Sequence, residues 1–96
     1  MFIQSRQRGP AGARESKDVH VTEIWKSGNR VHYVGGHGWK KKVEDAASEI
    51  KDGCVYFVSH GQYHDNLEVE PGGRFELRTV GDKTRIEDLT FLTLRS

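Results

Sequence analysis

The C-terminal third of the chain contains the pattern that most restricts the fold. Residues 74–79 alternate between charged and less polar side chains, a Gly-Asp-Lys turn follows at residues 81–83, and a second apolar run ends at Leu94. Alternation with a period of two is typical of a strand with one buried face. Two such runs that are joined by a glycine-containing turn are typical of a hairpin. The sequence therefore predicts an antiparallel hairpin over residues 77–94.

One segment has the periodicity of a helix. Its apolar residues recur at i, i+3, i+4 and i+7, and they are Val43, Ala46, Ala47 and Ile50. This stripe predicts a helix from Lys40 to Asp52, and Gly53 follows at the position where a left-handed residue commonly ends a helix. Because the stripe is narrow and rich in alanine, we expect the helix to pack closely onto a sheet.

The N-terminal half predicts two strands before the helix. Residues 19–25 form the first, with Ile24 and Trp25 assigned to its buried side and a bulge between Glu23 and Ile24. A Ser-Gly-Asn turn at residues 27–29 leads to a second strand at residues 31–34, and the glycine-rich residues 35–38 end it.

Residues 54–58 are the most apolar strand, so we expect a central position with both faces covered and Phe57 in the core. A polar loop at residues 59–66 and three further strands complete the order β-β-α-β-β-β-β. Short loops favour neighbouring antiparallel strands. The prediction is an α+β fold, with an antiparallel sheet of about five to six strands and one helix packed on a face.

Length and charge divide the chain into two regions. Ninety-six residues suffice for one compact domain, which we place at residues 18–96 after a flexible basic tail at residues 1–17. Residues 1–42 have a net charge of +6 and residues 43–96 a net charge of −5. No apolar run is long enough for a membrane span or a signal peptide, and the single cysteine, Cys54, is expected to be buried. A cytoplasmic location is expected.

Part of the chain is similar to a known family. The residues that carry the similarity are Glu44-Asp45-Ala46, Ile50, Gly53, Tyr56, Val58, Leu67-Glu68-Val69, Leu77-Arg78-Thr79, Asp82 and Glu87-Asp88-Leu89. In this order and spacing, they resemble a family of small, mostly bacterial domains of unknown function. The resemblance covers roughly residues 39–92, and Lys83 stands where the family usually has glycine. It implies an α+β architecture and brings no catalytic residues.

The chain offers weak candidates for catalysis or metal binding. His60 and His64 are four residues apart, but a loop at this point removes the helical geometry that would bring them together, so no metal site is expected. Ser59 and His60 are adjacent and point to opposite faces of a strand. Cys54 follows a helix C-terminus, where the dipole disfavours a thiolate. We expect neither an enzyme nor a cofactor, and a small hydrolase or metal site at the two histidines is the weakest hypothesis.

The most suggestive binding feature is the run from Trp39 to Lys42. The favoured interpretation is that Trp39 packs at the end of the core and that the lysines form a solvated face. In the alternative, three lysines in the first turn of the expected helix would favour a bound phosphate, and His37 and Trp39 would stack on an unpaired base. The preferred hypothesis is a non-enzymatic binding or adaptor module for a protein partner, without a membrane role. The alternative is weak nucleic-acid binding, for which the site residues would be Arg6, Arg8, Arg14, His37, Trp39, Lys40, Lys41 and Lys42.

Overall fold

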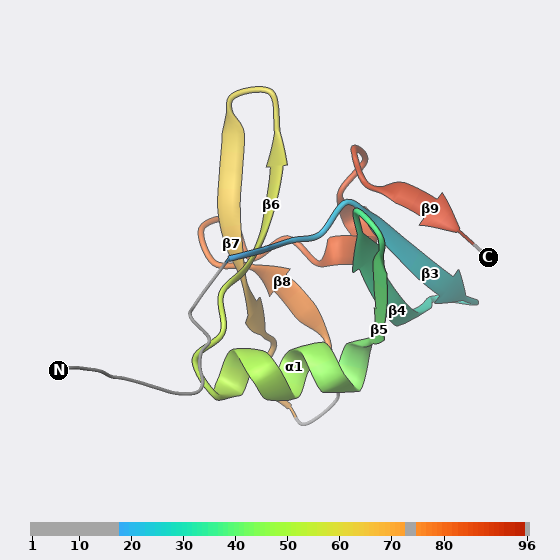
Figure 1. Ribbon diagram of the computed structural model, residues 1–96, viewed down its shortest axis with the longest axis vertical. Helices are drawn as coiled ribbons and strands as arrows, with labels where there is room; N and C mark the ends of the chain where they lie inside the picture. Colours follow the sequence, from blue (N-terminus) through green and yellow to red (C-terminus); the bar gives the residue numbers. More distant parts are fainter. Residues whose placement is uncertain (1–17, 73–74, 96) are drawn as a thin grey trace, which may run out of the picture.

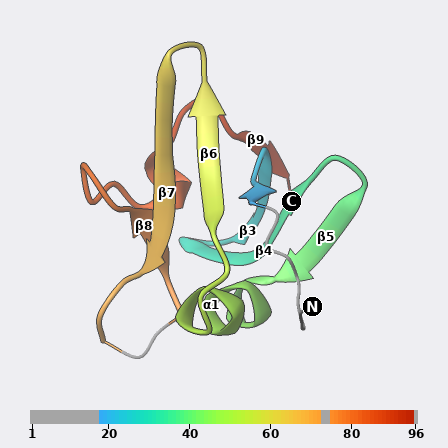
Figure 2. The same cartoon turned by 60° about the vertical axis from the view of Figure 1, so that its left-hand side comes forward.

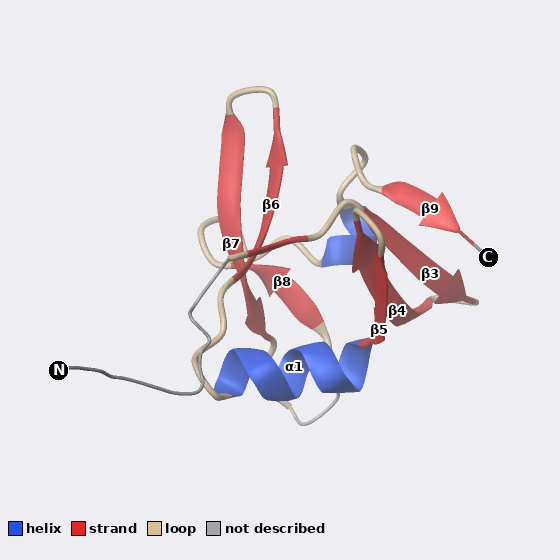
Figure 3. Cartoon of the chain, in the orientation of Figure 1, coloured by secondary structure: helices blue, strands red, loops and turns tan. Residues whose placement is uncertain are grey.

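The structure is a computed structural model that describes residues 18–72 and 75–95, so the tail predicted at residues 1–17 lies outside the described residues. The described part has one α-helix, one short 3-10 helix and eight strands, which confirms the α+β class (Figure 3). The elements in chain order are β2 (Val19–His20), β3 (Glu23–Ser27), β4 (Arg30–Gly36), β5 (Trp39–Lys42), α1 (Val43–Lys51), β6 (Tyr56–His60), β7 (Tyr63–Val69), β8 (Leu77–Thr79), η1 (Ile86–Asp88) and β9 (Thr93–Arg95).

The strands form two mixed sheets, and the expectation of a single antiparallel sheet is wrong (Figure 1). One sheet has the order β2-β6-β7-β8 and the other the order β5-β4-β3-β9. Each contains one parallel pair, β2 with β6 and β3 with β9. The chain passes from one sheet to the other at Val21 and Thr22, because the Val21 amide donates to Phe57 and the Thr22 amide donates to Gly35.

The hydrophobic core fills the space between the two sheets and the helix. Helix α1 contacts β4 and β5 of one sheet and β7 of the other, and it lies along one end of both sheets (Figure 2). The buried apolar residues come from the helix, from strands of both sheets, from η1 and from two connecting segments, and they are Val21, Ile24, Val31, Val34, Val43, Ala46, Ala47, Tyr56, Val58, Leu67, Leu77, Ile86 and Leu92.

The predicted N-terminal hairpin is confirmed, with its bulge displaced. Strands β3 and β4 pair in antiparallel fashion around a turn at Gly28, whose φ is 64°. The register runs from Trp25 opposite Tyr33 to Lys26 opposite Val31, so the bulge follows Trp25, two residues later than expected. Residues 35 and 36, which were expected to break the strand, continue it.

Helix α1 begins three residues later than predicted. Trp39–Lys42 forms β5 and pairs with β4, from Trp39 opposite Gly36 to Lys42 opposite Tyr33. Lys40 and Lys41 therefore lie in a strand and not in the first helical turn, and Lys42 is the N-cap residue of the helix. The predicted stripe is otherwise confirmed, with Ile50 half-buried, and Gly53 follows the helix with a φ of 106°.

The segment from residue 54 to residue 66 corrects three expectations. Residues 59–66 are not a loop, because β6 and β7 continue to a tight turn at Gly61 and Gln62. Phe57 is half-buried on the outer face of β6, since its neighbours Tyr56 and Val58 take the core side. Cys54 precedes the strand and is exposed, because the chain reaches the core only after residue 55.

The C-terminal hairpin prediction is wrong, although its turn is real. Strand β8 pairs with β7, only an isolated bridge joins Arg78 to Arg85 in the described part of the chain, and β9 leaves to pair with β3. Thr79 is buried, its amide donates to the Thr84 carbonyl at 2.9 Å, and its Oγ1 accepts from the Thr84 amide at 3.0 Å. The Gly81 amide donates to Asp65 Oδ2 at 2.8 Å. Residues 77–84 therefore form a closed loop, which side-chain and backbone hydrogen bonds hold.

Candidate binding surface

The structure divides the predicted patch at residues 39–42 between two faces of a sheet. Neighbouring residues of a strand point to opposite sides. Trp39 and Lys41 are half-buried on the core side of β5, whereas Lys40 and Lys42 are exposed on the outer face. His37 is exposed in the turn before β5. The remaining three predicted residues, Arg6, Arg8 and Arg14, lie outside the described residues.

Trp39 is a packing residue in this arrangement. Its ring meets the Tyr56 ring edge-on, with centroids 6.1 Å apart and an interplanar angle of 79°. A Cβ atom at Gly36 would lie 2.5 Å from Trp39 Nε1, so the indole occupies the space that a side chain would fill. The half-buried indole is therefore engaged in packing, which agrees with the packing interpretation of Trp39 from the sequence.

Lys41 belongs to a polar network at the edge of the core. Its Nζ donates to Glu49 Oε2 at 2.7 Å and to the Tyr56 hydroxyl at 3.1 Å, and that hydroxyl donates to Glu49 Oε1 at 2.5 Å. Burial and the bond to Glu49 raise the pKa of Tyr56 to about 12, against the opposing effect of Lys41. Burial acts to lower the pKa of Lys41, but its bonds to Glu49 and Tyr56 outweigh this and raise it. The network has a structural role.

The outer face of the sheet β5-β4-β3-β9 brings together residues that are distant in the sequence. Ile24 points into the core, so Trp25 points outward, and its partner Tyr33 lies on the same outer side. Lys42 lies opposite Tyr33 on β5, and Arg95 lies opposite Trp25 on β9. Lys42, Tyr33, Trp25 and Arg95 thus form one row across the four strands. Together with the neighbouring Lys40, this row is called the outer face below.

Gly35 determines how Trp25 lies on this face. A Cβ atom at Gly35 would stand 2.7 Å from Trp25 Cζ3 and 2.9 Å from Cη2. Only a residue without a side chain allows the indole to pack onto the strand at this point. The glycine thus holds the ring against the sheet.

Lys40 contacts both aromatic rings of the outer face. Its Nζ lies 4.5 Å from the centroid of the Trp25 ring and 4.5 Å from that of Tyr33, within the range of cation–π attraction. Arg95 Nε donates to Glu23 Oε1 at 2.8 Å, which ties the guanidinium to the edge of the face. The surface therefore presents two rings, three cations and one carboxylate that is already paired.

The sequence interpretation missed Trp25, Tyr33 and Arg95. Ile24 and Trp25 are adjacent in an extended strand, so both could not face the core, and this signal was present in the sequence. The pairing of Trp25 with Tyr33 had no local signal, because the bulge after Trp25 sets the register. The position of Arg95 depends on the long-range parallel pairing of β9 with β3.

The histidines do not form a metal site in the described part of the chain. His60 stacks on Phe91, with centroids 5.1 Å apart, and His64 stacks on Phe57 at 4.8 Å on the opposite side of the β6–β7 hairpin. Among residues 18–72 and 75–95, no group of three or more His, Cys, Asp or Glu side chains is placed to hold a metal ion.

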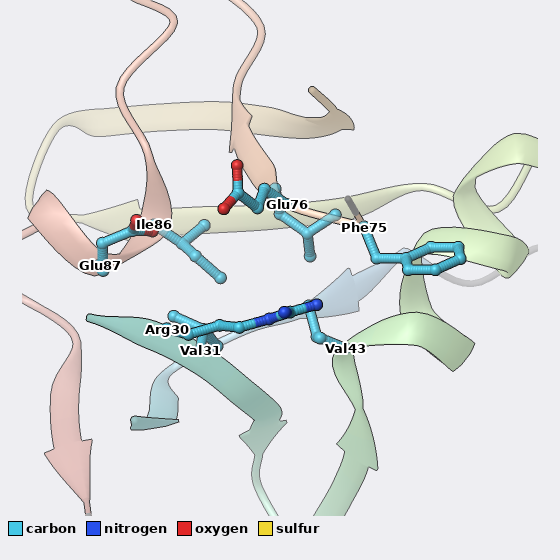
Figure 4. A pocket seen from close by; sticks show the side chains of 8 residues that line it. Arg30, Val31, Val43, Phe75, Glu76, Ile86 and Glu87 are labelled. Carbon is cyan, nitrogen blue, oxygen red and sulfur yellow. The ribbon is translucent and has the colours of Figure 1, made fainter. Parts of the chain in front are cut away.

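A small hollow near the start of β4 is a weaker candidate (Figure 4). Core residues such as Val43 and Ile86 line it together with the charged side chains of Arg30, Glu76 and Glu87. Its lining carries charges of both signs and neither a histidine nor a thiol. The outer face presents the clearer set of binding groups.

Comparisons of the chain with models of protein families, with curated proteins and with solved structures find no match. In the described residues, no helix has both the length and the apolar character needed to cross a bilayer. The fold and the surface define a small two-sheet α+β domain with a basic, aromatic sheet face.

Proposed function

We propose that this protein is a non-enzymatic binding domain and that its ligand combines a flat apolar group with negative charge. The observation that carries the proposal is the arrangement of Trp25 on Gly35, beside Tyr33, with the Lys40 ammonium close to both rings. The Lys40 Nζ marks a point from which one group contacts two aromatic rings. A flat ligand at that point gains stacking and apolar contact.

Charge decides the class of ligand. Lys40, Lys42 and Arg95 surround the rings, so an anionic group is attracted to this face. A cationic ligand would have to displace Lys40 while it remained close to the other two cations. The Glu23 carboxylate of this face is already held by Arg95 at 2.8 Å.

A protein partner, the preferred expectation from the sequence, is the competing interpretation of the same face. An acidic protein segment would satisfy the cations but would leave the rings without a flat partner. A titration that separates charge from stacking distinguishes the two.

The experiment is a proton–nitrogen NMR titration with thymidine monophosphate, thymidine and inorganic phosphate in parallel. The chain has two tryptophans, so the indole region contains one signal for the outer face and one internal reference, Trp39. We expect the nucleotide to shift the Trp25 indole and the Tyr33 and Lys40 amides, and to bind more tightly than either of its parts.

Two variants make the test specific. Lys42→Ala should weaken the response to the nucleotide, whereas Lys51→Ala, which removes an exposed lysine of α1, should not. The proposal is refuted if thymidine monophosphate leaves the outer face unchanged, or if Trp25→Ala binds it as well as the unmodified protein does.

A further inference from the structure

We infer that the natural ligand is an unpaired nucleic-acid segment that lies across the sheet along the row Lys42, Tyr33, Trp25 and Arg95. This inference rests on the proposed function and adds to it the length, the strandedness and the path of the ligand. The residues of the row are direct cross-strand neighbours, so they share one face.

The length of the row requires a chain. Neighbouring strands lie about 4.8 Å apart, so three steps from β5 to β9 separate the Cα atoms of Lys42 and Arg95 by about 14 Å. Tyr33 and Trp25 lie between the two residues, and the Arg95 guanidinium is held by Glu23, so a phosphate bound at Lys42 does not also contact Arg95 in this arrangement. A segment with phosphates on both sides of a base meets Lys42 at one end of the row, the rings in the middle and Arg95 at the other end.

The rings require an unpaired base. In a duplex the faces of the bases are stacked on one another, and a flat sheet has access only to the phosphates. On the outer face, a base takes the position that the Lys40 ammonium holds between the rings of Trp25 and Tyr33. Lys40 is exposed on a flexible stem, so its ammonium can then move to the adjacent phosphate.

In the second sheet, the Phe57 ring is not open in the same way as the rings of the outer face. Phe57 is stacked against His20 on one side, with centroids 4.7 Å apart, and against His64 on the other at 4.8 Å. Both faces of the Phe57 ring are already covered by side chains. This contrast assigns the base to the outer face with Trp25 and Tyr33.

Arg95 provides the variant that separates this inference from the proposed function. It contacts only the far end of a nucleic-acid segment that crosses the row, so Arg95→Gln should lower the affinity for an oligonucleotide by a larger factor than the affinity for thymidine monophosphate. Arg85→Gln is a matched control, because Arg85 is also an exposed arginine that is paired with a glutamate, Glu70, but it lies at the other sheet.

The experiment measures the binding of fluorescently labelled oligothymidylate of about six nucleotides by anisotropy, at several salt concentrations. A duplex of the same length, polyphosphate and thymidine monophosphate serve as competitors. We expect the oligonucleotide to bind at least about tenfold more tightly than the mononucleotide and the duplex. Trp25→Ala should lose roughly five- to hundredfold in affinity, with NMR spectra as the check on its fold. Arg95→Gln should reduce the salt slope by about 0.7, and Arg85→Gln should leave it unchanged.

Each result decides between the two levels of the argument. If the mononucleotide binds at the outer face and the oligonucleotide binds no tighter, the inference is overturned and the proposed function stands. If duplex or polyphosphate competes as well as the single strand and Trp25→Ala has no effect, charge alone explains binding and the inference is wrong. If no probe binds, both the inference and the proposed function fail.

Discussion

Tyr56→Phe tests the polar network that anchors the helix to the core edge. The substitution removes one hydroxyl that donates to Glu49 and accepts from Lys41, and it leaves a ring of the same shape. Near neutral pH, we expect the free energy of unfolding to fall by about 1–2 kcal/mol. The loss is no larger because the two charged partners, Lys41 and Glu49, remain bonded to each other.

The pH dependence gives the sharper prediction. The pKa of Tyr56 is raised from 10.0 to about 12 in the folded protein, so its neutral form stabilises the fold. This stabilisation is fully present below pH 10, and it is lost as the pH rises from about 10 to about 12. Linkage puts the loss of unfolding free energy at about 1 kcal/mol by pH 11 and at about 3 kcal/mol when complete. The raised pKa of Lys41 acts in the same direction, since stability falls as the ammonium is deprotonated.

Urea denaturation followed by tryptophan fluorescence from neutral pH to about pH 11 measures both effects. The variant lacks the ionisable hydroxyl, so its free energy of unfolding should fall less steeply above pH 10. The two proteins should become about equally stable near pH 11. Tyr33→Phe is the control, because it removes a tyrosine hydroxyl of the outer face and leaves the Tyr56 network intact. Equal alkaline losses in Tyr56→Phe and the unmodified protein would refute the role of Tyr56.

Three further substitutions test the packing. Gly35→Ala should lower the free energy of unfolding by about 1–3 kcal/mol and abolish the Trp25 response to thymidine monophosphate. The reason is that the new Cβ would stand 2.7 Å from the Trp39 carbonyl and 2.9 Å from Trp25 Cη2. An unchanged urea midpoint would contradict this prediction. Ile86→Ala should cost about 2–5 kcal/mol in the same assay, because Ile86 is 1% exposed; a loss below about 1 kcal/mol would mean that η1 does not close the core. Thr79→Val should cost about 1–3 kcal/mol by leaving the Thr84 amide without its side-chain acceptor, and unaltered amide hydrogen exchange at residue 84 would argue against this.

The interpretation of residues 39–42 shows how a correct composition leads to a wrong site. The sequence places an aromatic residue beside three lysines, and on a helix they would form one basic end. On strand β5, the same residues alternate, so Trp39 and Lys41 join the core side while the other two lysines face outward. The aromatic partners of Lys40 come instead from β3 and β4. The site therefore depends on whether Trp39–Lys42 forms a helical turn or a strand. Periodicity over four residues cannot distinguish these two conformations.

Local sequence signals were sufficient to predict an element wherever residues that are close in the sequence also contact one another in the structure. The apolar stripe of α1, its end at Gly53 and the first hairpin at Gly28 all follow from spacing and from glycine geometry within about ten residues. The inward positions of Leu77 and Thr79 likewise follow from alternation along β8. For these elements, the hydrogen bonds and the buried faces are set by the chain itself.

Tertiary structure decided the pairings that join distant segments. Strand β9 lies beside β3, about seventy residues earlier in the chain, where it brings Arg95 to Trp25 and Glu23. The local sequence of β9 is compatible with this pairing and also with a hairpin to β8. The choice between them depends on the entropy of loop closure and on the burial of the core, and both are properties of the whole domain. The sequence by itself determined the class of fold and most of its turns. The division into two sheets, and with it the outer face, arose only when both halves of the chain packed around one core.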